Sequence, residues 1–366
     1  MTRARGLFIA VLSWTAWGCG ESGKTAENHG ADATPPDAMI RQPYTIKALD
    51  KARITSVGGT ENFQRVRAPI EFKQGPFAKV TLKADLSTTC YPFETWQANP
   101  PPPSQNWPAD CDAFDRNYEF LLDEPEKEGN PPAFELVRAI TPFGGPIHLE
   151  ADITDIANAK PGAHVLTVFI ATWSDGAGKV TGSAGGWNVN VEIDVVPGTP
   201  PRNVLAAVPL VNGSLGAGAA FPEVKVQVPA GTKSTRLEYR VTGHGGGEGT
   251  RDACIGPAEE FCERTHRVIV DGVTIDEFKP VRLDCDKLCT IAQYRGRDYC
   301  LENPCGLIES VRAPRANWCP GSETPPYSWD PEALRTPGEH KFSFSINTIA
   351  PGGSWRVSST FYAYGD

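Results

Sequence analysis

The chain has 366 residues, and its 44 acidic side chains outnumber its 35 Lys and Arg side chains, which gives a formal net charge of −9. This acidic composition disfavours a nucleic-acid binder, because such a protein needs a basic face to neutralise phosphates. The 36 glycines and 33 prolines exclude a long helical bundle or coiled coil, since both residue types interrupt helices and favour short strands joined by turns.

The N-terminus carries a candidate export signal. Two arginines precede an apolar run over residues 6–17 that is too short to span a bilayer. The run ends in Ala16-Trp17-Gly18-Cys19, which resembles the lipobox of bacterial lipoproteins, where the cysteine is lipidated and becomes the new N-terminus. We expect a signal peptide at residues 1–18, then a lipidated Cys19 and a flexible tether over residues 19–45. The protein would then sit at the outer membrane or cell surface; ordinary secretion is the alternative.

Strict alternation of apolar and polar residues recurs along the rest of the chain and predicts half-buried β-strands. The clearest runs cover residues 187–195, 224–228, 237–241 and 342–346. We expect no amphipathic helix longer than a short stretch at residues 155–159. The pattern therefore predicts an all-β fold, either a sandwich or a jelly roll.

A domain boundary is expected at the tandem prolines Pro200-Pro201, because two prolines cannot continue a central strand. It divides the folded region into an N-terminal domain at residues 46–200 and a C-terminal domain at residues 201–366. The two domains would be of similar size.

Nine cysteines follow Cys19, and in an exported protein they are first interpreted as disulfides, because that compartment oxidises thiols. An odd number leaves at least one thiol without a partner. A zinc site made of Cys285-x3-Cys289 and Cys300-x4-Cys305 has plausible spacing, but the expected compartment disfavours it.

Several common catalytic motifs are missing from the sequence, namely G-x-S-x-G, H-E-x-x-H and G-x-x-x-x-G-K. The six histidines never form an H-x-H pair, and the methionines are Met1 and Met39. A copper site built from His and Met is therefore disfavoured, and we expect neither a metal nor a cofactor.

Three clusters place acidic, Arg and aromatic side chains beside cysteines. A carboxylate fixed next to an arginine could act as a general base with a low pKa, or it could form a loop salt bridge. The clusters are Cys111-Asp112-Ala113-Phe114-Asp115-Arg116, Ala258-Glu259-Glu260-Phe261-Cys262-Glu263-Arg264-Thr265-His266 and Arg315-Ala316-Asn317-Trp318-Cys319-Pro320-Gly321.

At these clusters the sequence resembles the peptide-N-glycosidase F family, the amidases that remove whole N-glycans from asparagine. The resemblance covers about residues 70–364. It implies two tandem eight-stranded antiparallel jelly-roll or β-sandwich domains with the active site at their interface. The family motif C-D-E-W-D-R falls on the first cluster, which puts the principal catalytic Asp on Asp115 and its neighbouring Arg on Arg116.

The second cluster resembles the family's G-C-A-E-W-C-F-R-T-H, which places the second essential acid on Glu260. The third resembles R-A-G-W-C-P-G, which places a substrate-contacting arginine on Arg315. Trp173 and Trp318 are expected to line the cleft. The resemblance also implies the disulfides Cys90 to Cys111, Cys254 to Cys262 and Cys285 to Cys319. The remaining cysteines are Cys289, Cys300 and Cys305, which cannot all pair.

This chain departs from the family pattern at two functional positions. The family's T-E-T-W is Ile170-Ala171-Thr172-Trp173 here, so a third important acid is lost. Asp175 or Glu259 could substitute for it. His244 stands where the family has a sugar-contacting Trp.

The loop between Cys90 and Cys111 is far longer than in the family. It is either a glycan-binding rim, since aromatic faces stack on sugar rings, or a stiff decoration pinned by its disulfide. Its aromatic residues are Tyr91, Phe93, Trp96 and Trp107.

The resemblance implies a monomeric amidase that hydrolyses the glycosyl-asparagine bond of N-glycosylated proteins or glycopeptides. In this hypothesis Asp115 positions or deprotonates water, Glu260 assists, and Arg116 and Arg315 orient the carboxylates and the substrate. One alternative is a lipoprotein that binds glycans or glycopeptides without cutting them. A remote alternative is a relative of the ascorbate-dependent copper monooxygenases, which share the jelly-roll architecture, but the missing histidine and methionine ligands argue against it.

Overall fold

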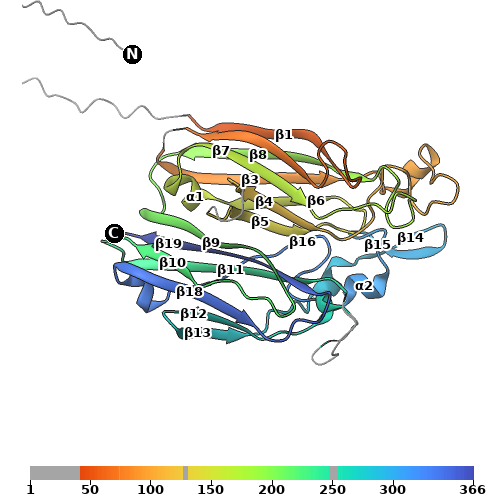
Figure 1. The fold of residues 1–366 in the computed structure, drawn as a ribbon. Coiled ribbons are helices and arrows are strands. Elements are labelled where there is room, and N and C mark those ends of the chain that lie inside the picture. The colour runs from red at the N-terminus through yellow and green to blue at the C-terminus, as the bar shows by residue number, and fades with distance from the viewer. Residues whose placement is uncertain (1–41, 74, 127–130, 247–253, 255, 257) are drawn as a thin grey trace, which may run out of the picture. The chain divides into compact units, whose positions relative to one another are not determined.

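Residues 42–366 are described by a computed structural model, with the exception of residues 74, 127–130, 247–253, 255 and 257 (Figure 1). The predicted signal peptide, Cys19 and most of the tether lie outside the described residues. The described residues form one compact unit.

The first half of this unit is an antiparallel sandwich of two sheets. The core between them is closed by the inward-facing side chains of β8, from Trp187 to Val195, which are 0% exposed. The alternation over residues 187–195 therefore predicted the strand and its buried face correctly. One sheet has the order β1 (Tyr44–Thr55), β8 (Gly186–Pro197), β3 (Phe77–Ser87), β6 (Ile147–Asp152), and the other has the order β5 (Phe134–Ile140), β4 (Asn117–Leu122), β7 (Gly162–Ile170), β2 (Arg65–Phe72).

The second half repeats this architecture. The strand runs predicted at residues 224–228, 237–241 and 342–346 lie in β10, β11 and β18. The fold prediction of two eight-stranded antiparallel sandwiches is confirmed. One sheet has the order β17 (Tyr327–Trp329), β11 (Ser234–His244), β19 (Ser354–Tyr364), β9 (Val204–Gly216), and the other has the order β10 (Val224–Val228), β18 (Gly338–Ile346), β12 (His266–Val270), β13 (Val273–Phe278).

Five smaller elements lie between β13 and β17, the first being a single 3-10 turn at Cys285–Leu288. The hairpin of β14 (Ile291–Tyr294) and β15 (Arg297–Cys300) is a separate two-stranded sheet. It is followed by the short helix α2 (Ile308–Arg312). Next comes β16 (Ser322–Glu323), which pairs with β5 and thereby extends a sheet of the first sandwich.

Helices are short, as the sequence predicted. The stretch expected at residues 155–159 lies in α1 (Thr154–Ala159). Among the described residues, no helix has the length and apolar character required to cross a membrane.

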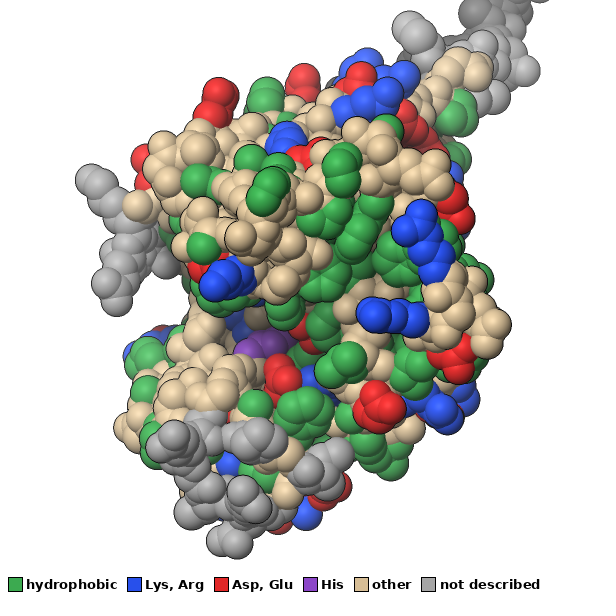
Figure 2. All heavy atoms as spheres, turned by 90° about the vertical axis from the view of Figure 1, so that its right-hand side faces the viewer, with side chains coloured by type: hydrophobic (Ala, Val, Ile, Leu, Met, Phe, Trp, Pro, Cys, Tyr) green, Lys and Arg blue, Asp and Glu red, His purple; other side chains and the backbone are tan. Residues whose placement is uncertain are grey.

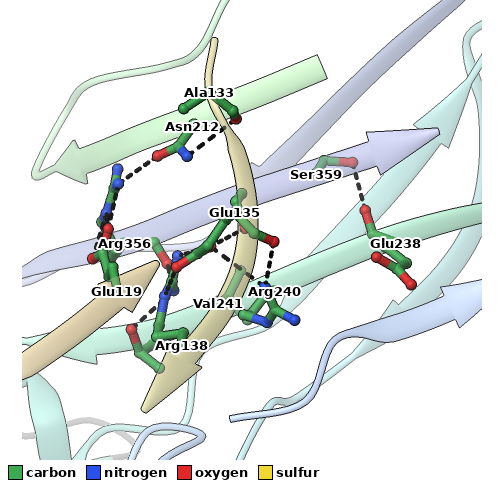
Figure 3. Close-up of polar contacts among 12 residues, drawn as sticks. Glu119, Ala133, Glu135, Arg138, Asn212, Glu238, Arg240, Val241, Arg356 and Ser359 are labelled. Atoms are coloured by element: carbon green, nitrogen blue, oxygen red, sulfur yellow. Dashed lines mark hydrogen bonds and ion pairs between the residues drawn. The ribbon is translucent and has the colours of Figure 1, made fainter. Parts of the chain in front are cut away.

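A buried ion-pair network joins the two sandwiches (Figure 3). Arg138 on β5 forms a bidentate pair with Glu135, with both N···O distances 2.7 Å, and its Nη1 donates to Thr242 Oγ1 on β11 at 3.1 Å. Arg356 on β19 forms a second bidentate pair with Glu119 on β4, at 2.8 and 2.7 Å. Burying such charges is costly unless every partner is in place, so the network fixes how the two sandwiches face each other.

The described structure contains four disulfides. Three join the cysteines that the resemblance pairs, Cys90–Cys111, Cys254–Cys262 and Cys285–Cys319. Cys289 and Cys300 form the fourth rather than contributing to a zinc site. Cys305 carries a free thiol.

Candidate active site

Asp115 lies in the segment that leads from the Cys90–Cys111 disulfide into β4. The hydroxyl of Thr141 pins this segment, because it donates to Phe114 O at 2.9 Å and accepts from the Arg116 backbone N–H at 2.8 Å. Burial and the nearby Glu260 carboxylate raise the pKa of Asp115 to about 7, although Arg315 and Arg116 oppose the shift. A carboxyl group with this pKa can exchange a proton near neutral pH.

Glu260 faces this carboxyl group from the second sandwich. Its Oε1 accepts a hydrogen bond from Arg315 Nη1 at 2.7 Å, and the Glu260 side chain is 27% exposed while that of Arg315 is 1% exposed. Arg315 Nη2 donates to the backbone oxygen and the hydroxyl of Ser310, at 2.8 and 2.9 Å. Burial raises the pKa of Glu260 and the Arg315 guanidinium opposes this shift. The structure therefore brings the two predicted acids and Arg315 into one site.

A stack of flat side chains supports Arg315. Its guanidinium carbon lies 4.3 Å from the ring centroid of Phe261 and 4.7 Å from that of Trp318. The His244 ring stacks on Trp318 with centroids 5.4 Å apart, and Trp318 Nε1 donates to Gly243 O at 2.8 Å. Trp318 is only 2% exposed. Its main contacts are therefore with the protein itself, and it orients His244 and Arg315.

His244 is uncharged at neutral pH. Burial lowers its pKa to about 3, and the positive charges of Arg138, Arg356 and Arg315 act in the same direction. His244 ends β11, only two residues after Thr242, which accepts the hydrogen bond from Arg138. The ion-pair network between the sandwiches thus reaches the site through β11.

Arg116 and Trp173 form the part of the site that belongs to the first sandwich. The guanidinium carbon of Arg116 lies 5.1 Å from the ring centroid of Phe114 and 5.8 Å from that of Trp173. Trp173 is 47% exposed, so its ring is open to a ligand. Of the two predicted cleft-lining tryptophans, Trp173 is the one with a large exposed surface.

Asp112 is a residue of the site that sequence reasoning missed. It is 0% exposed and accepts hydrogen bonds from the hydroxyls of Ser56, at 2.9 Å, and Thr172. Its Oδ1 lies 3.5 Å from Arg116 Nε. The signal that could have found it is its place beside Cys111, four residues before Arg116. Asp112 positions Arg116 rather than facing a ligand.

Figure 2 looks onto the end of the molecule where the loop between Cys90 and Cys111 and the β14–β15 hairpin lie. The surface is hollowed between the upper and lower parts of the view. Acidic, basic and histidine side chains line the floor, and hydrophobic side chains border it. Among the described residues, no group of three His, Cys, Asp or Glu side chains is arranged to hold a metal ion.

Comparisons with known proteins agree with this fold. A family model described as "Peptide-N-glycosidase F, C terminal" matches residues 217–362. Over 231 residues the chain is 26% identical to peptide-N(4)-(N-acetyl-beta-D-glucosaminyl)asparagine amidase F of Elizabethkingia miricola, a match that covers 59% of this chain and 57% of that protein. These matches confirm the resemblance to the peptide-N-glycosidase F family.

Solved structures of family members share the fold. PNGF-II superimposes with a TM-score of 0.66 at 18% identity, over 88% of this chain and 65% of that chain. PNGase F from Flavobacterium meningosepticum superimposes with a TM-score of 0.65 at 20% identity, over 89% of this chain and 96% of that chain. The chain thus covers less than two thirds of PNGF-II and of the E. miricola amidase.

Both acids that could substitute for the one lost at Ala171 are engaged in other contacts. Glu259 is 0% exposed and is held by Arg264, by Trp355 Nε1 and by the backbone N–H of Ala350. Asp175 is exposed, and its Oδ1 accepts from three backbone N–H groups of its own loop. Glu259 is therefore a structural residue, and Asp175 orders its loop.

Proposed function

We propose that this protein is an amidase that hydrolyses the bond between asparagine and the first sugar of an N-glycan and releases the glycan intact. The observation that carries the proposal is that Asp115, whose pKa is raised to about 7, lies close enough to the Glu260–Arg315 pair for both charges to act on it. The names of the relatives, which describe amidases acting on glycosylated asparagine, support the same chemistry.

In the proposed reaction, ionised Asp115 accepts a proton from a water molecule. The water oxygen bonds to the carbonyl carbon of the asparagine side chain, and the carbon–nitrogen bond of the amide then breaks. The proton held by Asp115 passes to the departing nitrogen, so the peptide gains an aspartate and the sugar leaves as a glycosylamine. Arg116 and Arg315 orient the carboxylates and the substrate, and their positive charges offset the negative charge that develops on the carbonyl oxygen.

The second candidate function is glycan binding without hydrolysis. The alanine at position 171, with Glu259 fully engaged elsewhere, favours it, because a site that needs three acids would be inactive here. A neutral His244 is compatible with either function.

Mass spectrometry of a denatured N-glycoprotein, incubated with the purified protein in heavy-oxygen water, tests the proposal. An amidase converts glycosylated Asn to Asp with one heavy oxygen and releases the whole glycan, and Asp115→Asn abolishes both changes. Unaltered glycopeptide that co-purifies with the protein would identify the binding function instead. An Ala171→Glu variant, with Ala171→Gln as its control, shows whether a third acid increases turnover.

We further propose that N-glycosylated proteins or glycopeptides are the substrates and that the protein is exported and acts as a monomer. Four disulfides are typical of an oxidising compartment and support export. A lipid on Cys19 would anchor it to a membrane, which mass spectrometry of the mature N-terminus would detect.

A further inference from the structure

An aromatic wall connects the two sandwiches beside the hollow. It consists of rings from the Cys90–Cys111 loop and rings from the β14–β15 hairpin. Phe93 makes the central contacts, with its centroid 5.1 Å from those of both Tyr294 and Tyr299. Its members are Tyr91, Phe93, Trp96, Trp107, Tyr294 and Tyr299.

Both halves of the aromatic wall are held rigidly. The Cys90–Cys111 disulfide closes the base of the loop, and Trp96 Nε1 donates to Cys90 O at 2.9 Å. The Cys289–Cys300 disulfide closes the base of the hairpin. The rings are therefore preorganised, and a ligand would lose little free energy in ordering them.

The wall is continuous with the candidate active site. Cys111 precedes Asp115 by four residues, and Trp107 packs with Phe114 against the Cys90–Cys111 disulfide. On the other side, the Cys285–Cys319 disulfide ties the segment before the hairpin to the residue after Trp318. Figure 1 shows the loop and the hairpin at the same end of the molecule, which is the face viewed in Figure 2.

All six rings of the aromatic wall are partly exposed. Partly exposed aromatic rings present flat apolar faces, and the C–H faces of sugar rings pack on such surfaces. We propose that the aromatic wall binds the outer sugars of an N-glycan whose first sugar lies at Asp115. The substrates are then glycans with extended antennae rather than trimmed cores. This inference rests on the proposed function.

Two other roles make different predictions. If the wall only clamps the sandwiches together, its loss will slow hydrolysis of every substrate, because Asp115 and Glu260 come from different sandwiches. If the wall binds the polypeptide, its loss will slow hydrolysis of long glycopeptides more than that of short ones, whatever the size of the glycan.

The experiment uses the full chain with Trp96→Ala and Tyr294→Ala, and Tyr294→Phe as the variant that keeps the ring. Leu307→Ala is the matched control, because Leu307 is 75% exposed and lies between the β14–β15 hairpin and α2. Each is assayed on one glycopeptide that carries either a complete biantennary glycan or only its two core sugars, and on a longer peptide with the same glycan. Binding of the free biantennary glycan is measured by calorimetry in the Asp115→Asn background.

We expect each alanine variant to weaken binding of the biantennary glycan and to raise its KM by about 10-fold, while Tyr294→Phe and Leu307→Ala change both by less than about 2-fold. The substrate with two core sugars should react at the wild-type rate. Three results would overturn the proposal. They are an equal loss of activity on both glycans, a loss that depends on peptide length, and no loss of activity or binding at all. If wild type binds the biantennary glycan through these rings but cleaves nothing, the amidase function fails and the aromatic wall stands. If the core substrate is cleaved and the variants bind normally, only the wall fails.

Discussion

Arg138 and Thr242 belong to different sandwiches, and the 3.1 Å hydrogen bond between Arg138 Nη1 and Thr242 Oγ1 joins them two residues before His244. Arg138 is 0% exposed and also donates to the backbone oxygen of Arg356 at 2.8 Å. The orientation of the two sandwiches and the position of His244 therefore depend on the same guanidinium group.

Replacing Arg138 by methionine should lower the free energy of unfolding by about 3–5 kcal/mol, because it leaves the Glu135 carboxylate buried without its bidentate partner. Urea denaturation measures this. The double variant Glu135→Gln/Arg138→Met removes the unpaired charge and should recover roughly half of the loss. A single variant as stable as wild type would show that the pair is not needed for stability.

Hydrolysis should increase as the pH rises through about 7, because only ionised Asp115 can accept a proton and its pKa is raised to about 7. His244, with a pKa of about 3, should not contribute between pH 5 and 9. The kcat/KM profile of wild type and of His244→Gln tests both statements. A rate that is flat between pH 5 and 9 in wild type would contradict the assignment of Asp115.

The same carboxyl group should make the stability depend on pH. The folded-state pKa of Asp115 is above its unfolded value of 3.8, so its burial costs nothing at low pH and destabilises the fold progressively as the pH rises towards about 7. Asp115→Asn should therefore match wild type near pH 4 and be more stable at pH 8 by on the order of 2–4 kcal/mol. Thermal or urea unfolding at the two pH values checks this, and an equal gain at both would rule out titration of Asp115 as the cause.

Arg315→Lys should lower kcat by about 100-fold or more, because lysine cannot bond Glu260 and Ser310 simultaneously in the geometry of the guanidinium group. The acidic limb of the kcat/KM profile should also move to a different pH. The reason is that the pKa values of Asp115 and Glu260 both depend on where the positive charge of Arg315 lies. Arg267→Lys, at the exposed pair with Glu277, is the control and should keep activity. A shifted stability with an unchanged pH profile would make Arg315 purely structural.

The free thiol of Cys305 should resist alkylation in the folded protein. Burial raises its pKa to about 12, so the reactive thiolate is nearly absent at pH 8. Peptide mapping after iodoacetamide treatment should find Cys305 labelled only when the protein is denatured first. Fast labelling of the native protein would show that the thiol is accessible and ionised.

The strands that face one core could be predicted from sequence, and those between two cores could not. In β8 the side chains from Trp187 to Val195 alternate because one face is inside the sandwich. Every residue of β5 is buried, since its second face meets the other sandwich, and this removes the alternation. Glu135 and Arg138 look like surface residues in the sequence because their partners on β11 and β19 are remote along the chain.

The candidate site could be predicted only through its motifs. Asp115, Glu260 and Arg315 are far apart in sequence, and no periodicity relates them. The stacking of His244 on Trp318 depends on the loop that carries Trp318 packing across the end of β11, which no local pattern encodes. Asp112 was missed because its role comes from hydroxyl donors on two other segments, Ser56 and Thr172.

The strand β16 limits how this protein can be recombined with its relatives. Ser322 and Glu323 pair with Ile140 and Ala139 on β5, so the second half of the chain supplies an edge strand to the first sandwich. In a chimera joined at Pro200, β16 of the C-terminal half would have to pair with β5 of an N-terminal half taken from another protein. Otherwise the edge of β5 would expose unpaired N–H and C=O groups, which invite intermolecular strand pairing. Exchange of either half is therefore expected to succeed only when the pairing of β16 with β5 is kept.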